Sequence, residues 1–63
     1  MVNVMDLQPG DKIRLGGEVM AEVVSNPRDG IWIQVRYLTH PENPDQVGTE
    51  ELLFAEEIVD IVT

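Results

Sequence analysis

The sequence predicts an all-β domain, a small five-stranded antiparallel barrel, from three observations. The chain has 63 residues, which is room for one domain spanning residues 1–63. Its apolar residues fall in short segments of strand length, several of which alternate polar and apolar positions. Groups of Pro, Gly, Asn and Asp separate these segments, and such residues favour turns. Short strands between frequent turns are typical of small sandwiches and barrels.

The first predicted strand covers residues 12–15, where basic and apolar side chains alternate. It follows the turn signal Pro-Gly-Asp at residues 9–11 and precedes Gly16-Gly17, which predicts a hairpin turn. Because successive side chains of a strand point to opposite faces, Lys12 and Arg14 are expected on the outer face.

Residues 18–25 and 31–38 are predicted to form an antiparallel hairpin around a five-residue turn at 26–30. The segment 31–38, IWIQVRYL, is rich in the β-branched and aromatic residues that favour strands. Pairing Ser25 with Ile31 places positions 19, 21, 23, 31, 33, 35 and 37 on one face, and all seven are apolar or aromatic. This face is predicted to be the core, formed by Val19, Ala21, Val23, Ile31, Ile33, Val35 and Tyr37.

The C-terminal segment, residues 50–62, fits two interpretations. We predict a strand at 51–55, a tight turn at Glu56-Glu57 and a closing strand at 58–62, because the last five residues are β-branched around one acid. Phe54 is expected in the core. The alternative is a hairpin-based sheet with a C-terminal helix, because several apolar residues of this segment also have helical spacing.

Most of the chain resembles an SH3-like barrel. The residues that carry the resemblance are LQPGDKI at 7–13, EV at 18–19, VV at 23–24, GIWIQV at 30–35, and Phe54 with EEIV at 56–59. The Pro-Gly-Asp start before a basic-apolar strand resembles KOW-type domains of ribosomal and transcription proteins. The ending resembles the closing strands of small barrels that accompany electron-transfer complexes, such as the photosystem I accessory subunit. The resemblance implies a fold and no functional residue, because the basic loop that contacts RNA in KOW domains is not evident here.

The charge distribution argues against nucleic acid and anionic membranes as partners. The net charge is −8, from 12 acidic and four basic residues. Residues 1–37 carry five acids and all four bases, whereas residues 38–63 carry seven acids and no base. Because nucleic-acid binding depends on Lys and Arg to neutralise phosphates, we expect no useful affinity for DNA or RNA at physiological salt. The acidic half predicts a partner protein with a basic surface, or simply a soluble domain; the oligomeric state stays open.

Composition excludes several classes of site. Without cysteine the chain has no disulfide, thiol nucleophile or thiolate metal site, which fits a cytoplasmic protein. No apolar run approaches the ~20 residues that span a bilayer, and the first residues do not form a signal-peptide pattern. His40, Glu42 and Asp45 include metal-ligand types, but we interpret them as solvated loop residues because zinc usually takes four well-placed ligands.

The sequence also predicts a domain without catalytic activity or cofactor. The neighbouring carboxylates Glu50-Glu51 and Glu56-Glu57 suggest acid–base chemistry, but sequence neighbours on a strand point to opposite faces. No nucleophile arrangement or phosphate-binding glycine loop is present. A chain of this length is expected to lack the walls of a ligand pocket of ~300 Å³ or more.

The candidate binding surface is the outer face of the hairpin, centred on Trp32. The predicted register places Trp32 opposite Val24 and on the same side as Arg36. Trp, Met and Arg are residue types that recognition surfaces favour. The candidate site residues are Trp32, Arg36, Met20, Val24 and Leu38. The alternative is a second small core, in which a long loop or the N-terminal arm covers this patch with Val2, Val4, Met5 and Leu7.

The sequence therefore predicts a non-catalytic protein–protein interaction module. The alternative function is an accessory nucleic-acid-associated, KOW-like barrel that contacts RNA through Lys12, Arg14 and Arg36. The net charge opposes this alternative.

Overall fold

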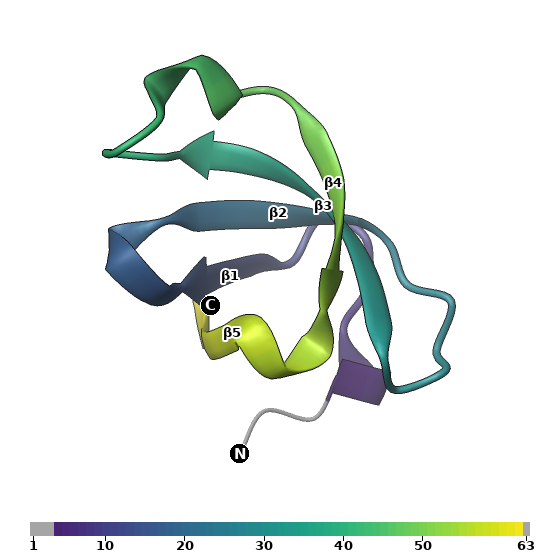
Figure 1. Cartoon of the computed structure of the whole chain (residues 1–63). Helices are drawn as coiled ribbons and strands as arrows, with labels where there is room; N and C mark the ends of the chain where they lie inside the picture. Colours follow the sequence, from purple (N-terminus) through teal and green to yellow (C-terminus); the bar gives the residue numbers. More distant parts are fainter. Residues whose placement is uncertain (1–3, 63) are drawn as a thin grey trace.

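Five antiparallel strands form a single sheet in the computed structural model, which describes residues 4–62 (Figure 1). The strands are β1 (Lys12–Leu15), β2 (Met20–Ser25), β3 (Trp32–Thr39), β4 (Glu50–Phe54) and β5 (Ile58–Val62). Four 3₁₀ turns accompany them: η1 (Val4–Asp6), η2 (Gly16–Glu18), η3 (Pro44–Gln46) and η4 (Ala55–Glu57). The all-β prediction is confirmed. The alternative of a C-terminal helix is wrong, because η4 has three residues and β5 follows it directly.

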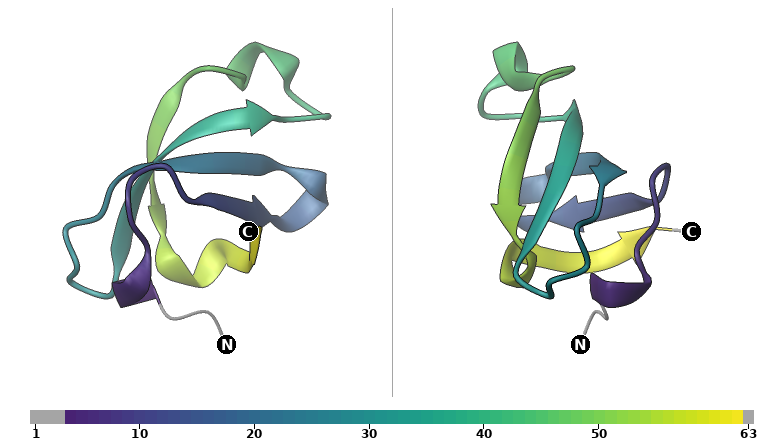
Figure 2. Two further views of the ribbon diagram at one scale, coloured as in Figure 1. Left: turned by 180° about the vertical axis from the view of Figure 1, so that it is seen from behind. Right: turned by 90° about the vertical axis from the view of Figure 1, so that its right-hand side faces the viewer.

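The sheet has the strand order β4-β3-β2-β1-β5 and curls strongly without closing (Figure 2). Within residues 4–62, no hydrogen-bonded ladder joins β4 to β5, so the predicted closure into a barrel is wrong. The turn η4 gives the reason, since it carries the chain away from β4 and the next strand pairs with β1 instead. At this turn the N–H of Phe54 donates to Oε2 of Glu57 at 3.1 Å, not to a strand. No helix among the described residues has the length and hydropathy needed to cross a membrane.

The hydrophobic core lies on the inner face of the curled sheet. Each strand contributes buried apolar side chains to it, and the N-terminal arm adds Leu7, which is 1% exposed. The buried residues are Leu7, Ile13, Leu15, Val19, Ala21, Val23, Ile33, Val35, Tyr37, Leu53 and Ile58. Six of the seven residues predicted for the hairpin face are therefore confirmed as core.

Two predicted core residues are exposed instead. Ile31 is 53% exposed because it precedes β3 and has no partner on β2; its C=O accepts the N–H of Ala55 at 2.7 Å. Phe54 is 46% exposed because its neighbour Leu53, 6% exposed, is the residue of β4 that points inward. The run Leu52-Leu53-Phe54 is apolar throughout, so its sequence does not show which residues face the core.

The β2–β3 register differs from the predicted one by two residues over 21–23 and by three at Met20 and Ser25. Val23 lies opposite Val35 and Ala21 opposite Tyr37, and irregularities follow Met20 and Val23. A shift of two residues keeps every side chain on its face, because the faces alternate with a period of two. Apart from Ile31, the inner face was therefore predicted correctly from a register that was wrong.

Side chains in the β2–β3 loop explain this shift. Oδ1 of Asn26 accepts the N–H of Arg28 at 2.9 Å, and Oδ1 of Asp29 accepts the N–H groups of Trp32 and Ile31 at 3.0 and 2.8 Å. The hydrogen bonds from the N–H groups of Trp32 and Ile31 hold the pKa of Asp29 below its ordinary value. Such local bonds compete with strand pairing, so the loop is longer than the predicted turn.

Candidate binding surfaces

The outer face of β3 and β4 carries an aromatic pair, the half-buried Trp32 and the exposed Phe54. Trp32 lies directly opposite Phe54, and their rings stack with centroids 4.1 Å apart and an interplanar angle of 24°. Leu52, 53% exposed, lies two residues before Phe54 and therefore on the same face. We call Trp32, Leu52 and Phe54 the aromatic patch. A stacked pair of this kind is stable on the surface, yet it leaves a large apolar area in contact with water.

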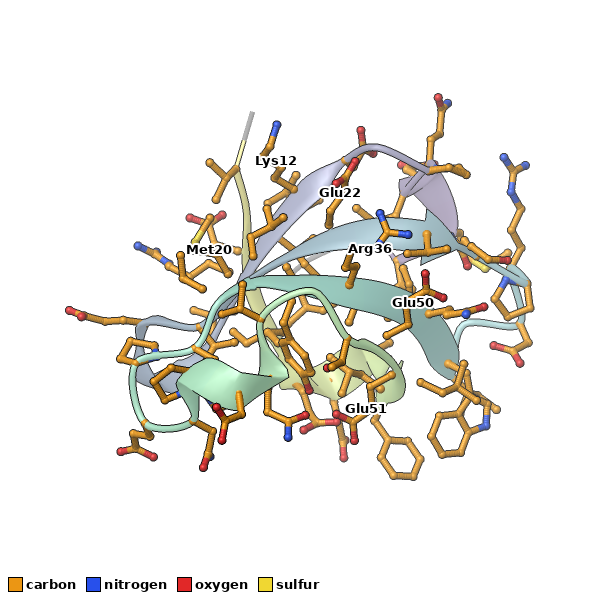
Figure 3. All side chains as sticks on the ribbon, turned by 90° about the horizontal axis from the view of Figure 1, so that it is seen from above. Lys12, Met20, Glu22, Arg36, Glu50 and Glu51 are labelled. Carbon is orange, nitrogen blue, oxygen red and sulfur yellow. The ribbon has the colours of Figure 1, made fainter. Side chains whose placement is uncertain are left out.

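Arg36 is held within the domain. Its Nη2 donates to Oε2 of Glu50 at 2.7 Å, and Oε1 of the same carboxylate accepts from Nε2 of Gln34 at 3.0 Å. Figure 3 shows Arg36 between Glu22 and Glu50 on this face, in agreement with the strand pairing. With both ends of the pair about half exposed, the bond contributes little to stability. The guanidinium of Arg36 is thus already engaged before any partner arrives.

The five predicted site residues do not form one cluster. Trp32 stacks on β4, whereas Met20 lies opposite Thr39 near the other end of β3, where Leu38 also lies. Val24 lies at the irregularity between Val23 and Ser25, so the predicted Val24–Trp32 pair is wrong. Three predicted site residues are half-buried on the outer face: Met20, Val24 and Leu38. The neighbours of Trp32 on that face are instead Phe54 and Leu52 of β4.

Two residues of the N-terminal arm, Val4 and Leu7, pack against the core. Leu7 is fully buried in the core, and Val4 packs against the same cluster. The side-chain amide of Asn26 donates to the C=O groups of Val4 and Leu7 at 2.8 and 2.9 Å, which ties the arm to the β2–β3 loop (Figure 2). Val4 and Leu7 therefore belong to the main core and not to a second one. Met5, 46% exposed, lies near Gly30 of the β2–β3 loop, and Val2 lies outside the described residues.

A shallow hollow of about 320 Å³ adjoins the aromatic patch. Phe54 and Ile31 supply its apolar lining, and Ala55, Gly30 and Glu56 complete it. Sequence reasoning placed Ile31 and Phe54 in the core, so it missed both residues as surface groups.

A larger open groove of about 460 Å³ lies at the opposite end of β3 and is lined by residues of the β1–β2 turn and the β3–β4 loop. These two segments lie on the same side of the molecule (Figure 1). Gly16 and Gly17 come from the first of these segments, and His40 and Glu42 from the second. The expectation that so short a chain lacks such a hollow is wrong. The unclosed sheet accounts for the groove, since no ladder joins β4 to β5 in the described part of the chain and both strands line it, through Leu53 and Val59.

Tyr37 is the polar centre of this groove. The ring is 6% exposed, and its hydroxyl donates to Oε2 of Glu51 at 2.5 Å. His40 packs edge-on against it, with ring centroids 5.2 Å apart. Burial, followed by the hydrogen bond to Glu51 and the charges of Glu51 and Glu57, raises the pKa of Tyr37 to about 12. Glu50 and Glu51 thus have separate partners on opposite faces, as predicted.

Tyr37 is expected to ionise in the folded domain with a midpoint near pH 12, whereas the unfolded chain should ionise near 10. Since the folded pKa is the higher one, the stabilisation is complete below about pH 10 and is lost as the pH rises toward 12. Phenolate absorbance measures this directly, because the chain has a single tyrosine. Glu51→Gln should lower the midpoint while leaving the contribution of burial. A folded-state midpoint near 10 would contradict the buried, hydrogen-bonded hydroxyl.

His40 and Glu42 line the same groove, whereas Asp45 is not among its lining residues. His40 packs on Tyr37, Glu42 lines the groove, and Asp45 lies in η3. Among residues 4–62, no three His, Cys, Asp or Glu side chains are placed to hold one metal ion.

One signal in the sequence identifies the patch residues that were missed. Trp32 and Arg36 are four residues apart on β3, and Glu50 and Phe54 are four residues apart on β4. An antiparallel alignment therefore pairs ring with ring and charge with charge at once, which is the observed register.

No family model matches the sequence, and comparisons with curated proteins and with solved structures find no match either.

Proposed function

We propose that this protein is a non-catalytic protein–protein interaction module that binds its partner through the aromatic patch. The observation that carries the proposal is the outer-face stack of the half-buried Trp32 on the exposed Phe54, with the exposed Leu52 beside it. Aromatic residues supply much of the binding energy of protein interfaces because they bury large areas with few rotatable bonds. We also propose that the domain is related to SH3-like barrels. The five antiparallel strands support this relation, whereas the unclosed sheet argues against it.

The surroundings of the patch define the partner's chemistry. Glu50 lies on the same face of β4, and Glu56 lines the adjoining hollow with Ile31 and Phe54. Arg36 and Glu50 engage each other, so neither offers a free charge at the rim of the patch, and Glu56 is the carboxylate that the adjoining hollow presents. The complementary surface is an apolar side chain that enters the hollow, flanked by Lys or Arg residues.

The alternative, an RNA-binding barrel, depends on Lys12, Arg14 and Arg36. Arg14 contacts Asp60 at 3.3 Å and Arg36 contacts Glu50, so two of the three bases are beside acids. Phosphate contacts would have to displace these carboxylates. A salt-sensitive RNA complex of about micromolar affinity or tighter in an anisotropy assay would nevertheless favour this alternative over the proposal.

Trp32→Ala is expected to weaken partner binding by about 2 kcal/mol or more, as for an interface hot spot. The fold should survive, because Trp32 is half-buried on the outer face and the core is on the inner one. Co-purification identifies the partner, and calorimetric titration of that partner with each variant then measures the loss.

Phe54→Ala should reproduce the loss, because Phe54 stacks on Trp32. Val47→Ala is the matched control, since Val47 is 48% exposed but lies in the β3–β4 loop. Unchanged binding by Trp32→Ala, together with a loss of stability of the size seen for core Trp truncation, roughly 3–5 kcal/mol, would instead make the ring structural.

A further inference from the structure

The groove at the opposite end of β3 is built from segments that are distant in the sequence. It is lined by the β1–β2 turn, β3, the β3–β4 loop and the region from β4 to β5. Leu15, Val19, Leu53 and Val59 supply an apolar lining. At about 460 Å³ and open to solvent, the groove has room for one long side chain.

The charge of the groove has one sign. Glu42 and Glu57 line it from different segments, and Glu51 adds a third carboxylate through its bond to Tyr37. No Lys or Arg lines it, and residues 38–63 contain no base. Among the described residues, the two ion pairs are Arg14–Asp60 and Arg36–Glu50, so neither uses a carboxylate of the groove. A cationic group would therefore be drawn to this groove and an anion repelled.

The two aromatic rings of the groove, Tyr37 and His40, favour a guanidinium group over an ammonium group as the bound cation. Tyr37 and His40 meet edge-on, and both line the hollow. Ring surfaces attract cations, and the planar guanidinium group stacks on them more readily than an ammonium group does. Nδ1 of His40 is also buried without a hydrogen-bond partner among the described residues. Buried polar atoms normally have hydrogen-bond partners, so Nδ1 of His40 is an atom that could still form a hydrogen bond.

We propose that the groove binds an arginine side chain presented by a partner protein. The guanidinium group offers five N–H donors in one plane, which suits carboxylates that approach from two segments. Its methylene stem suits the apolar lining. A lysine supplies a point charge without the plane, and therefore fits fewer of these features.

This inference concerns a different surface from the aromatic patch and goes beyond the proposed function. Tyr37 points to the inner face and Trp32 to the outer face, at opposite ends of β3. A substitution can therefore abolish binding at the aromatic patch without affecting the groove, or the reverse. In particular, Trp32→Ala should leave arginine binding unchanged.

The test is an NMR titration of the ¹⁵N-labelled domain at low ionic strength with the peptide acetyl-Gly-Gly-Arg-Gly-Gly-amide. We expect saturable shifts confined to the groove, at Gly16, Gly17, Tyr37 and His40. The same peptide with citrulline, an uncharged isostere of arginine, should cause none. The lysine peptide should bind more weakly, because it lacks the planar group.

Matched variants assign the binding to the groove. Glu42→Gln and Glu57→Gln should each weaken binding about fivefold or more. Both keep a side-chain oxygen, so Glu57→Gln retains an acceptor for the N–H of Phe54. Glu56→Gln removes the same charge from the neighbouring residue, which lies outside the groove, and should leave the affinity unchanged.

Three outcomes would overturn the inference. One is the absence of saturable shifts up to about 10 mM peptide, which corresponds to negligible affinity. Another is equal binding of the citrulline or lysine peptide, which removes the assignment to arginine. The third is an equal effect of Glu56→Gln and Glu57→Gln, which would make the attraction a property of the net charge alone.

Discussion

Val35→Asp is expected to unfold the domain. Val35 has no exposed surface and lies at the centre of the sheet, opposite Val23 on β2 and Glu51 on β4. An unpaired charge at this position costs several kcal/mol. Domains are stable by about 0.05–0.15 kcal/mol per residue, so this chain has only about 3–9 kcal/mol in total. Circular dichroism should show no cooperative melt, and the amide NMR spectrum should lose its dispersion.

Val59→Asp is the matched control for this prediction. The chemical change is the same and also falls in a strand, but Val59 is 59% exposed on β5. Its effect on stability should stay within about 1 kcal/mol, as for most surface substitutions. A cooperative melt of Val35→Asp close to that of the unmodified protein would contradict the core described above.

Leu7→Ala is expected to destabilise the domain by about 2–5 kcal/mol, because it leaves a cavity where the arm enters the core. Leu7 is 1% exposed although it belongs to no strand. In a domain of this size, the thermal midpoint should fall by about 10 °C or more. Thermal and urea unfolding followed by circular dichroism measure the change.

Leu52→Ala is the control for Leu7→Ala, since it removes the same atoms from a side chain that is 53% exposed. Its thermal midpoint should change little. Equal effects of the two substitutions would show that the arm does not complete the core.

The sequence predicts the strands better than their pairing. The limits predicted for β1 and β5 are those observed, because alternation and β-branching mark them clearly. The inner face of the hairpin was also predictable, since an even shift in register does not change it. The register itself was not, because it depends on bonds from Asn26 and Asp29 to the backbone, which no hydrophobic pattern records.

The candidate site was predictable only in part. Trp32 was expected on the outer face, and it lies there. Its partner Phe54 was assigned to the core, because an unbroken apolar run does not show which residues face inward. The groove around Tyr37 was not predictable, because its lining comes from four separate segments and exists only because the sheet stays open.

One edge of β4 pairs with β3, and the other has no strand partner within residues 4–62. A second copy of the chain could pair with this free edge. Unpaired edges that carry apolar residues such as Leu52 and Phe54 template fibril growth. Here Glu57 already occupies the N–H of Phe54, and two further carboxylates, Glu50 and Glu51, lie along the strand. A second copy pairing here would have to displace Glu57 from the N–H of Phe54. It would also bring its own carboxylates close to Glu50 and Glu51, and like charges repel each other. We therefore expect the carboxylates along β4 to oppose aggregation at this edge of the open sheet.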